Sequence, residues 1–378
     1  MLQKRLFETA EAGGMRVKNR FVRSAVWMRW ADDEGHLTAG LAGFYRTLVD
    51  GGVGTILTGY TFIEPSGKAN FRQAGFYDDS FIDEWKALTN YAHAHEARMV
   101  LQVAYGGSQA GMDREHPYAV FGPSAVRNSK TGITPVEMTV EDIRERERIF
   151  AEAALRARRA GFDGIEVHAA HGYLLSQFLT PFFNHRTDDY GGPIHNRARF
   201  LYETLQTMRR AVGPDFPIWL KFNLFDATEN PADGMTFDEA KEVFRHFDEM
   251  KVVDIIEPSA SNESLATVTG IHTHVRRPET QSYFRAYLRE LSAIISTPLI
   301  MLGGNRSMDV MEEVMNDVPN IVLASLGRPL LSEPDLINKW AADRSYRPRC
   351  VSCNHCWDTE PNSCILNRKR LDVKVLKK

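Results

Sequence analysis

Short apolar runs alternate with longer amphipathic segments along most of this chain. Eight of these runs are rich in Val, Ile or Leu and too short for a helix, and most end in Gly, Pro or polar residues, which is typical of buried β-strands. The expected strands are residues 20–26, 53–59, 99–104, 164–168, 217–223, 252–258, 298–304 and 320–327.

Two of the intervening segments carry clear helix signals. In residues 139–161, Thr139 is suited to the N-cap, Asp142 follows three residues later, and Gly161 is suited to the C-terminal end. A second helix is expected over residues 195–213, with Gly213 at its end. The alternation of strand and helix continues through most of the chain.

Eight strand–helix units predict an α/β fold, a closed (β/α)8 TIM barrel over residues 1–340, followed by a short Cys-rich C-terminal tail over residues 341–378. An open doubly wound sheet is the alternative. The barrel is favoured because no G-x-G-x-x-G follows the first strand. The insert at residues 105–138 is expected to lie over the barrel mouth.

The composition changes this picture little, but it excludes several classes of partner. Hydrophobic residues make up 43%, charged residues 25%, and the net charge is -3. These values are typical of a globular protein and give no basis for binding nucleic acid or an acidic membrane. No apolar run is long enough to span a membrane, and the N-terminus lacks a secretory h-region. We therefore expect a cytoplasmic protein that acts on small molecules, of undetermined oligomeric state.

Polar residues and glycines recur at the C-terminal ends of the expected strands. Active sites of (β/α)8 barrels lie at this edge. The residues concerned are Ser24, Ala25, Gly59, Gln102, His168, Lys221, Ser259, Gly303, Gly304, Gly327 and Arg328. One polar strand end means little, but their recurrence around one rim predicts a ligand site.

The last two strands indicate a phosphate site. Gly303, Gly304 and Gly327 would expose backbone N–H groups, and Arg328 could add a bidentate contact. Earlier in the chain, the Gln102 amide suits the edge of a heteroaromatic ring. Lys221, if buried, must be paired or must face an anion. It could pair with Glu166 or serve a cofactor, and the two roles are compatible.

His168, His171 and Tyr173 follow one strand and leave several interpretations open. A zinc site needs a third ligand, for which Glu166 and His185 are the nearest candidates. Two neutral imidazoles could instead donate hydrogen bonds to a carbonyl or nitro oxygen, while the phenol supplies a proton to carbon. The three side chains could also be ordinary packing residues.

Residues 5–340 resemble the Old Yellow Enzyme family of FMN-dependent oxidoreductases, in the branch whose first strand reads "RSA". The likeness rests on "LFETAEAGGMRVKNRFVRSA", "GGVGTILTG", "LQVAYGGSQA", "AGFDGIEVHAAHGYLLSQFLTPFFNHRTDDYGG", "NRARF", "LGGN" and "LGRPLLSEPDL". The resemblance implies a TIM barrel that binds FMN noncovalently at its C-terminal face. It also implies hydride transfer from NADH or NADPH to FMN N5, and from N5 to the β-carbon of an activated C=C bond.

The resemblance assigns expected roles to individual residues. His168 and His171 would bind the electron-withdrawing oxygen of the substrate, and Tyr173 would donate the proton. The expected FMN-binding residues are Ser24, Ala25, Val26, Gly59, Gln102, Lys221, Gly303, Gly304, Asn305, Gly327 and Arg328. Lys221 stands where many members have arginine, near flavin N1 and O2.

Two departures bear on substrate preference. Trp27 stands where better-known members have threonine or cysteine, and "AYGGSQA" replaces "WHAGRQA", so that Tyr105 and Ser108 form a different wall. Trp27 and Tyr105 are therefore expected to contact substrate. The substrate of the better-known members does not carry over to this chain.

All four cysteines lie in the tail, as Cys350, Cys353, Cys356 and Cys364. Their spacing suits a [4Fe–4S] cluster or zinc, and unliganded thiols are the third possibility. Relatives with an added C-terminal domain hold a cluster on a similar run, but the last spacing is shorter here. We expect no second redox domain after the tail.

The leading hypothesis is an FMN-dependent, NAD(P)H-dependent ene-reductase. One alternative is an oxidative N-demethylase or dehydrogenase that passes electrons through a tail cluster. A metal-dependent hydrolase with metal at His168 and His171 is a second alternative. The third is a non-catalytic barrel that binds partners through the tail.

Overall fold

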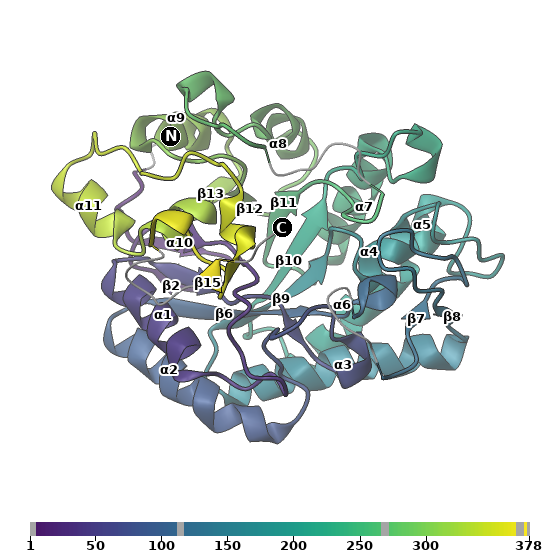
Figure 1. Cartoon of the computed structure of the whole chain (residues 1–378). Coiled ribbons are helices and arrows are strands. Elements are labelled where there is room, and N and C mark those ends of the chain that lie inside the picture. The colour runs from purple at the N-terminus through teal and green to yellow at the C-terminus, as the bar shows by residue number, and fades with distance from the viewer. Residues whose placement is uncertain (1–4, 112–116, 266–271, 368–373, 376–378) are drawn as a thin grey trace.

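The computed structural model describes residues 5–111, 117–265, 272–367 and 374–375. Its main sheet is a closed barrel of parallel strands (Figure 1). The barrel strands are β3 (Phe21–Arg23), β4 (Thr55–Leu57), β6 (Arg98–Ala104), β9 (Gly164–Ala169), β10 (Ile218–Asn223), β11 (Ile255–Ser259), β12 (Leu299–Met301) and β13 (Ile321–Leu326).

Pairing between β4 and β6 closes the ring, because β4 also pairs with β3 and the remaining strands follow in order around the sheet. The short β5 (Thr61–Phe62) adds to the side of β6. All eight expected strands are present, with bounds that differ by a few residues. The closed barrel is confirmed, and the open sheet is wrong.

The helices pack around the outside of this barrel (Figure 1). They are α1 (Ala39–Asp50), α2 (Ile82–Ala94), α3 (Val140–Arg159), α4 (Leu174–Leu179), α5 (Ile194–Arg197), α6 (Arg199–Val212), α7 (Phe237–Met250), α8 (Arg285–Ser292), α9 (Met308–Asp317), α10 (Arg328–Ser332) and α11 (Leu336–Ala342). No helix in the described ranges is long and apolar enough to cross a membrane.

Helix α3 begins as its sequence predicts. The Thr139 hydroxyl accepts from the Asp142 N–H at 3.1 Å, and the Asp142 carboxylate accepts from the Thr139 N–H at 2.9 Å. These reciprocal bonds satisfy N–H groups that the first helical turn leaves unpaired. The helix expected over 195–213 is instead divided at Ala198 into α5 and α6, and it ends at Gly213 in the left-handed region.

One end of the barrel is plugged by an N-terminal hairpin of β1 (Ala10–Ala12) and β2 (Met15–Val17). Its apolar side chains cluster with inward-facing barrel residues, including Val22 and Trp219. The Trp219 indole N–H also donates to the Gly13 carbonyl at 2.8 Å. A buried apolar plug at this end leaves the opposite end, where the strands finish, for polar chemistry.

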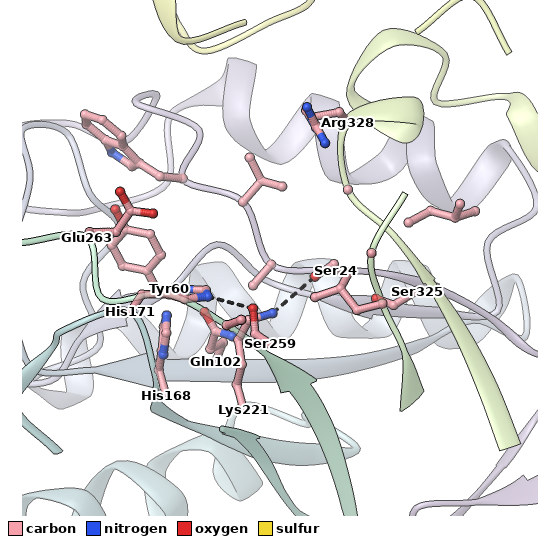
Figure 2. A pocket seen from close by; sticks show the side chains of 18 of the residues that line it. Ser24, Tyr60, Gln102, His168, His171, Lys221, Ser259, Glu263, Ser325 and Arg328 are labelled. Carbon is pink, nitrogen blue, oxygen red and sulfur yellow. Dashed lines mark hydrogen bonds between the residues drawn. The ribbon is translucent and has the colours of Figure 1, made fainter. Parts of the chain in front are cut away.

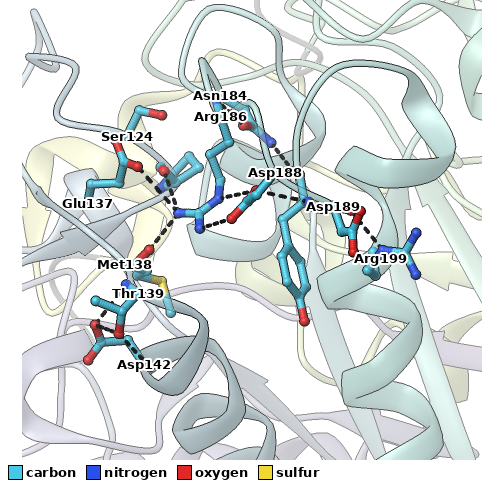
Figure 3. Close-up of polar contacts among 12 residues, drawn as sticks. Ser124, Glu137, Met138, Thr139, Asp142, Asn184, Arg186, Asp188, Asp189 and Arg199 are labelled. Carbon is cyan, nitrogen blue, oxygen red and sulfur yellow. Dashed lines mark hydrogen bonds and ion pairs between the residues drawn. The ribbon is translucent and has the colours of Figure 1, made fainter.

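The insert after β6 contains a short parallel pair, β7 (Phe121–Gly122) and β8 (Val136–Glu137). Arg186 holds it against the loop after α4, as Figure 3 shows. Its guanidinium donates to the carbonyls of Pro123 at 3.1 Å and Met138 at 2.5 Å, and it pairs with the Asp188 carboxylate at 2.5 Å. The long segment after Tyr173 therefore fixes this insert against the barrel.

The tail, as far as the structure describes it, packs against the barrel. Figure 1 shows it in yellow beside β13 and α10. The Asn362 side chain donates to the Trp27 carbonyl at 2.9 Å, and the Asn362 backbone N–H donates to the Met28 carbonyl at 2.8 Å. The Arg306 guanidinium donates to the Cys350 carbonyl at 3.1 Å. These contacts bring the tail to the rim where the strands end.

Replacing Thr139 by alanine should lower the free energy of unfolding by about 1 kcal/mol, because one partner of the capping box is lost. Urea denaturation followed by circular dichroism measures this change. Val140→Ala, at an exposed position of the same turn, is the control and should change stability by less than about 0.5 kcal/mol. Equal effects of the two substitutions would contradict the capping role.

Candidate functional site

A cavity of about 420 Å³ opens at the C-terminal ends of the barrel strands. Figure 2 shows side chains from several strands pointing into it. The predicted residues that line it are Ser24, Ala25, Val26, Trp27, Gln102, His168, His171, Tyr173, Lys221, Gly303, Gly304, Asn305, Gly327 and Arg328. Its volume lies in the range of small-molecule and cofactor sites.

Two of the residues predicted to contact FMN or substrate do not line this cavity. The Gly59 N–H donates to the Tyr45 hydroxyl at 2.7 Å, and a Cβ at Gly59 would lie 2.8 Å from the Val26 carbonyl oxygen. Gly59 therefore lets two strand ends approach each other behind the wall. Tyr105 is buried, with its hydroxyl 2.6 Å from that of Ser66. The structure does not place Tyr105 where it could contact substrate in this cavity.

Sequence reasoning assigned no role to several residues that line the cavity. They are Tyr60, Asn70, Gln109, Lys130, Glu263, Tyr283, Phe284 and Trp357, among others. Tyr60 directly follows a strand end and could have been found from that position. Trp357 lies in the tail, and no local signal in the sequence indicates that the tail reaches the barrel mouth.

His168 is held as a neutral hydrogen-bond donor. Its Nδ1 accepts from the Ala170 N–H at 3.3 Å, so the proton of the neutral ring belongs on Nε2. Burial, together with His171 and the charge of Lys221, holds the pKa of His168 well below its usual value. A neutral imidazole here can donate to a substrate oxygen without a cation being buried beside Lys221.

His171 is fixed by its backbone as well as by its ring. Its φ of 60° lies in the left-handed region, and its carbonyl accepts from the Gln109 side chain at 2.8 Å. Its Nε2 lies 2.7 Å from the Ser259 hydroxyl (Figure 2). Burial, with a smaller contribution from Lys221, lowers the pKa of His171 to about 3. This histidine is therefore also neutral at physiological pH.

The phenol of Tyr173 completes this side of the cavity. The Tyr173 ring lies edge-on to His168, with 4.9 Å between centroids, and 5.3 Å from the ring of Tyr60. The Tyr60 hydroxyl accepts from the Asn70 side chain at 2.7 Å. Two imidazoles and two phenols therefore surround one space, which can bind a flat, polarised molecule.

Lys221 does not pair with Glu166, contrary to the sequence-based expectation. Its Nζ lies 2.5 Å from Glu257 on the neighbouring strand. The strand register explains this difference, because Lys221 stands opposite Glu257 on β11 and opposite His168 on β9. Glu166 stands opposite Trp219 instead, one step further down the barrel.

Glu257 gathers several donors around its buried carboxylate. Besides Lys221, the hydroxyls of Ser24 at 3.4 Å and Ser325 at 2.5 Å donate to it. The Lys221 ammonium also lies 3.5 Å from the Ser24 hydroxyl (Figure 2). A buried charge pair needs such additional hydrogen bonds to offset its desolvation. Lys221 therefore enters the cavity with its charge largely compensated.

Glu166 interacts with Gln102, which stands opposite it on β6. The Gln102 Nε2 donates to the Glu166 carboxyl at 2.5 Å, and both side chains are fully buried. Among the residues that the structure describes, the Gln102 Oε1 and the Glu166 Oε1 have no hydrogen-bond partner. Burial, and then the charge of Glu257, raises the pKa of Glu166 to about 8. An unpaired buried amide oxygen on the wall fits an N–H donor of a heteroaromatic ligand.

The opposite end of the cavity presents backbone groups and cations. Gly303 and Gly304 have φ values of 107° and 79°, a region that favours glycine. The Asn305 amide donates to the Met301 carbonyl at 3.1 Å and the Ser325 carbonyl at 3.0 Å, so it shapes this loop from within. Arg328 adds a guanidinium at the rim. The arrangement suits an anion such as a phosphate.

All four cysteines line a second, smaller cavity of about 100 Å³, and Arg328 lies between it and the main cavity. Burial raises the pKa of the Cys356 thiol to about 12. Within the described ranges, no three His, Cys, Asp or Glu side chains converge as ligands of one metal ion. This holds for the tail, and also for His168 and His171, whose expected third ligand Glu166 interacts with Gln102.

Stability should decrease with rising pH because of Glu166. The unfolded carboxyl ionises near its ordinary pKa, whereas the folded one stays protonated up to about pH 8, so its stabilising contribution is complete below pH 4 and is lost as pH rises through 8. Between pH 5 and 9 the free energy of unfolding should fall by roughly 2–5 kcal/mol from this group. Urea denaturation across this range measures the fall.

The Glu166→Gln protein should show a much smaller decrease over the same range, since glutamine does not ionise. Glu242→Gln removes an exposed carboxyl from α7 and serves as the matched control, which should follow the wild-type curve. A Glu166→Gln curve parallel to the wild type would show that Glu166 is not the group responsible.

Known proteins are similar to this chain in sequence and in fold. The chain is 30% identical to the NADH oxidase of Thermoanaerobacter brockii over 352 residues, 92% of this chain and 52% of that protein. It is 29% identical to the cinnamate reductase of Clostridium sporogenes, over 96% of this chain and 57% of that protein.

Among solved structures, a complex of 2-naphthoyl-CoA reductase matches with a TM-score of 0.83 and 25% identity, over 93% of this chain and 54% of that one. The chain thus spans about half the length of these relatives. Residues 5–346 match the NADH:flavin oxidoreductase / NADH oxidase family along most of the chain, and the protein belongs to that family.

Proposed function

We propose that the protein reduces an activated C=C bond with FMN as bound cofactor and NADH or NADPH as the source of hydride. The observation that carries this proposal is the grouping of two neutral imidazoles and a phenol in one cavity with Gln102 and Lys221. The relative named cinnamate reductase supports it, because cinnamate contains a C=C bond conjugated to a carboxyl group.

The residues of the cavity suit the parts of FMN in order. The Gln102 Oε1 can accept from the ring N–H, and Lys221, which lines the same cavity, would lie beside the same edge. The glycine loop of Gly303 and Gly304, with Arg328, can hold the phosphate. FMN, when bound, supplies the carrier that accepts a hydride from the nicotinamide and passes it to carbon.

The chain's own residues would activate and protonate the substrate. His168 and His171 would donate N–H groups to its carbonyl, carboxyl or nitro oxygen, which makes the conjugated carbon more electrophilic. In the structure, the His171 Nε2 lies 2.7 Å from the Ser259 hydroxyl, and the substrate oxygen would replace this hydroxyl as its hydrogen-bond partner. Tyr173 would deliver a proton to the neighbouring carbon from its phenol.

Replacing Tyr173 by phenylalanine should slow substrate reduction about 10²–10⁴-fold, because the proton donor is lost. Reduction of the flavin by NADH or NADPH should stay near the wild-type rate. Stopped-flow absorbance separates these half-reactions, with cyclohexenone or cinnamate as the oxidant.

Tyr60→Phe is the matched comparison for this experiment, since it removes the neighbouring phenol of the same cavity and should slow substrate reduction far less than Tyr173→Phe does. The assignment would be wrong if Tyr60→Phe, and not Tyr173→Phe, stopped the oxidative half-reaction. If the purified protein does not bind FMN, the proposed function itself is wrong.

We further propose that Cys350, Cys353, Cys356 and Cys364 hold an iron–sulfur cluster. The supporting observation is that all four line one small cavity. Four thiolates around one small space suit a cluster, which is ligated around its periphery. Electron transfer through such a cluster would suit the alternative dehydrogenase function.

Protein purified without oxygen should then contain iron and acid-labile sulfide, about four of each per chain, and little zinc. Metal analysis and the absorbance spectrum provide the measurement. Cys353→Ser should lower the iron content, and Ser352→Ala, which alters the adjacent hydroxyl, should not. Stoichiometric zinc, or metal-free protein with four free thiols, would contradict the cluster.

A further inference from the structure

The buried pair of Gln102 and Glu166 has a feature that the proposed function does not use. Only Gln102 lines the cavity, and Glu166 lies directly behind it on the adjacent strand. The amide contacts the carboxyl through Nε2, and its buried Oε1 is the polar atom left for a ligand. The orientation of that amide decides whether the ligand meets an acceptor oxygen or a donor N–H group.

An ionised carboxylate has only acceptor oxygens, so it requires the N–H side of Gln102. This is the arrangement in the structure, where Nε2 donates to Glu166 at 2.5 Å and Oε1 has no partner within the described part of the chain. A protonated carboxyl can either accept from Nε2 or donate to Oε1. Glu166 thus fixes the amide strictly when it is ionised and loosely when it is protonated.

We propose that Glu166 is a positioning residue which orients the Gln102 amide, so that Oε1 faces the cavity and selects a ring that offers an N–H group there. The inference rests on the proposed FMN site, where that group is the flavin N3–H. Glu166 itself does not line the cavity. It acts through Gln102 and differs in this respect from the residues that contact cofactor.

The charges around Glu166 set the pH at which this orientation becomes strict. Glu257 on β11 raises its pKa, Lys221 on β10 lowers it, and Gln102 on β6 stabilises the ionised form. His168, two residues away on the same strand, is neutral. The orienting effect is therefore expected to increase between pH 6 and pH 9.

The experiment compares FMN with FMN methylated at N3, which lacks the N–H group. Full-length protein stripped of flavin is titrated with each at pH 6 and pH 9, and the quenching of flavin fluorescence gives Kd. The preference for FMN is the Kd of the methylated flavin divided by the Kd of FMN. In the wild type this ratio should be about tenfold larger at pH 9 than at pH 6, which corresponds to the free energy of one buried hydrogen bond.

The Glu166→Gln protein should show a smaller preference that does not change with pH, because glutamine both donates and accepts as the protonated carboxyl does. Glu257→Gln provides a matched comparison with the opposite expectation. Loss of the Glu257 charge lowers the pKa of Glu166, so the strong preference should already be present at pH 6.

If Glu166 had only a structural role, its replacement would weaken the binding of both flavins equally, and the ratio of the two Kd values would not change. The inference is overturned if Glu166→Gln keeps the wild-type ratio at both pH values, or if the wild-type ratio does not change with pH. Wild-type protein that binds neither flavin would instead refute the proposed function, so the two failures are distinguishable.

Discussion

The closed ring of parallel strands is the constraint on which the rest of this structure depends. Pairing of β4 with β6 satisfies the edges that an open sheet would leave exposed, and it brings the C-terminal ends of all eight strands to one rim. The N-terminal hairpin plugs the other end with apolar side chains. Residues as distant in sequence as Ser24 and Ser325 can therefore bind one carboxylate, that of Glu257.

Strand register, which the ring also fixes, decides which buried charges meet. Side chains at directly opposed positions are neighbours, so Lys221 meets Glu257, and Glu166 meets Gln102. A shift of one residue would turn each of these side chains to the other face of the sheet. The polar contacts of the cavity thus depend on the strand register, which the packing of apolar side chains in the core fixes.

The fold could be predicted from sequence because eight apolar runs of strand length recur along the chain, separated by amphipathic segments. The start of α3 could be predicted because its two capping residues lie three positions apart in the sequence. Most of the cavity wall followed from the strand ends. The partner of Lys221 could not be predicted, since register between strands depends on packing. Trp357 was missed for a related reason, because Asn362 attaches the tail to the barrel through the Trp27 carbonyl, and no local pattern encodes that contact.

Charge compensation gives the cavity its particular character. Lys221 would favour an anionic ring beside it, but the adjacent Glu257 carboxylate cancels most of its field at a distance of 2.5 Å. The net charge at this edge then depends on Glu166, which is uncharged below pH 8 and negative above it. On this proposal, a single carboxyl that does not line the cavity would determine both the charge of the wall and the hydrogen-bonding face that Gln102 presents.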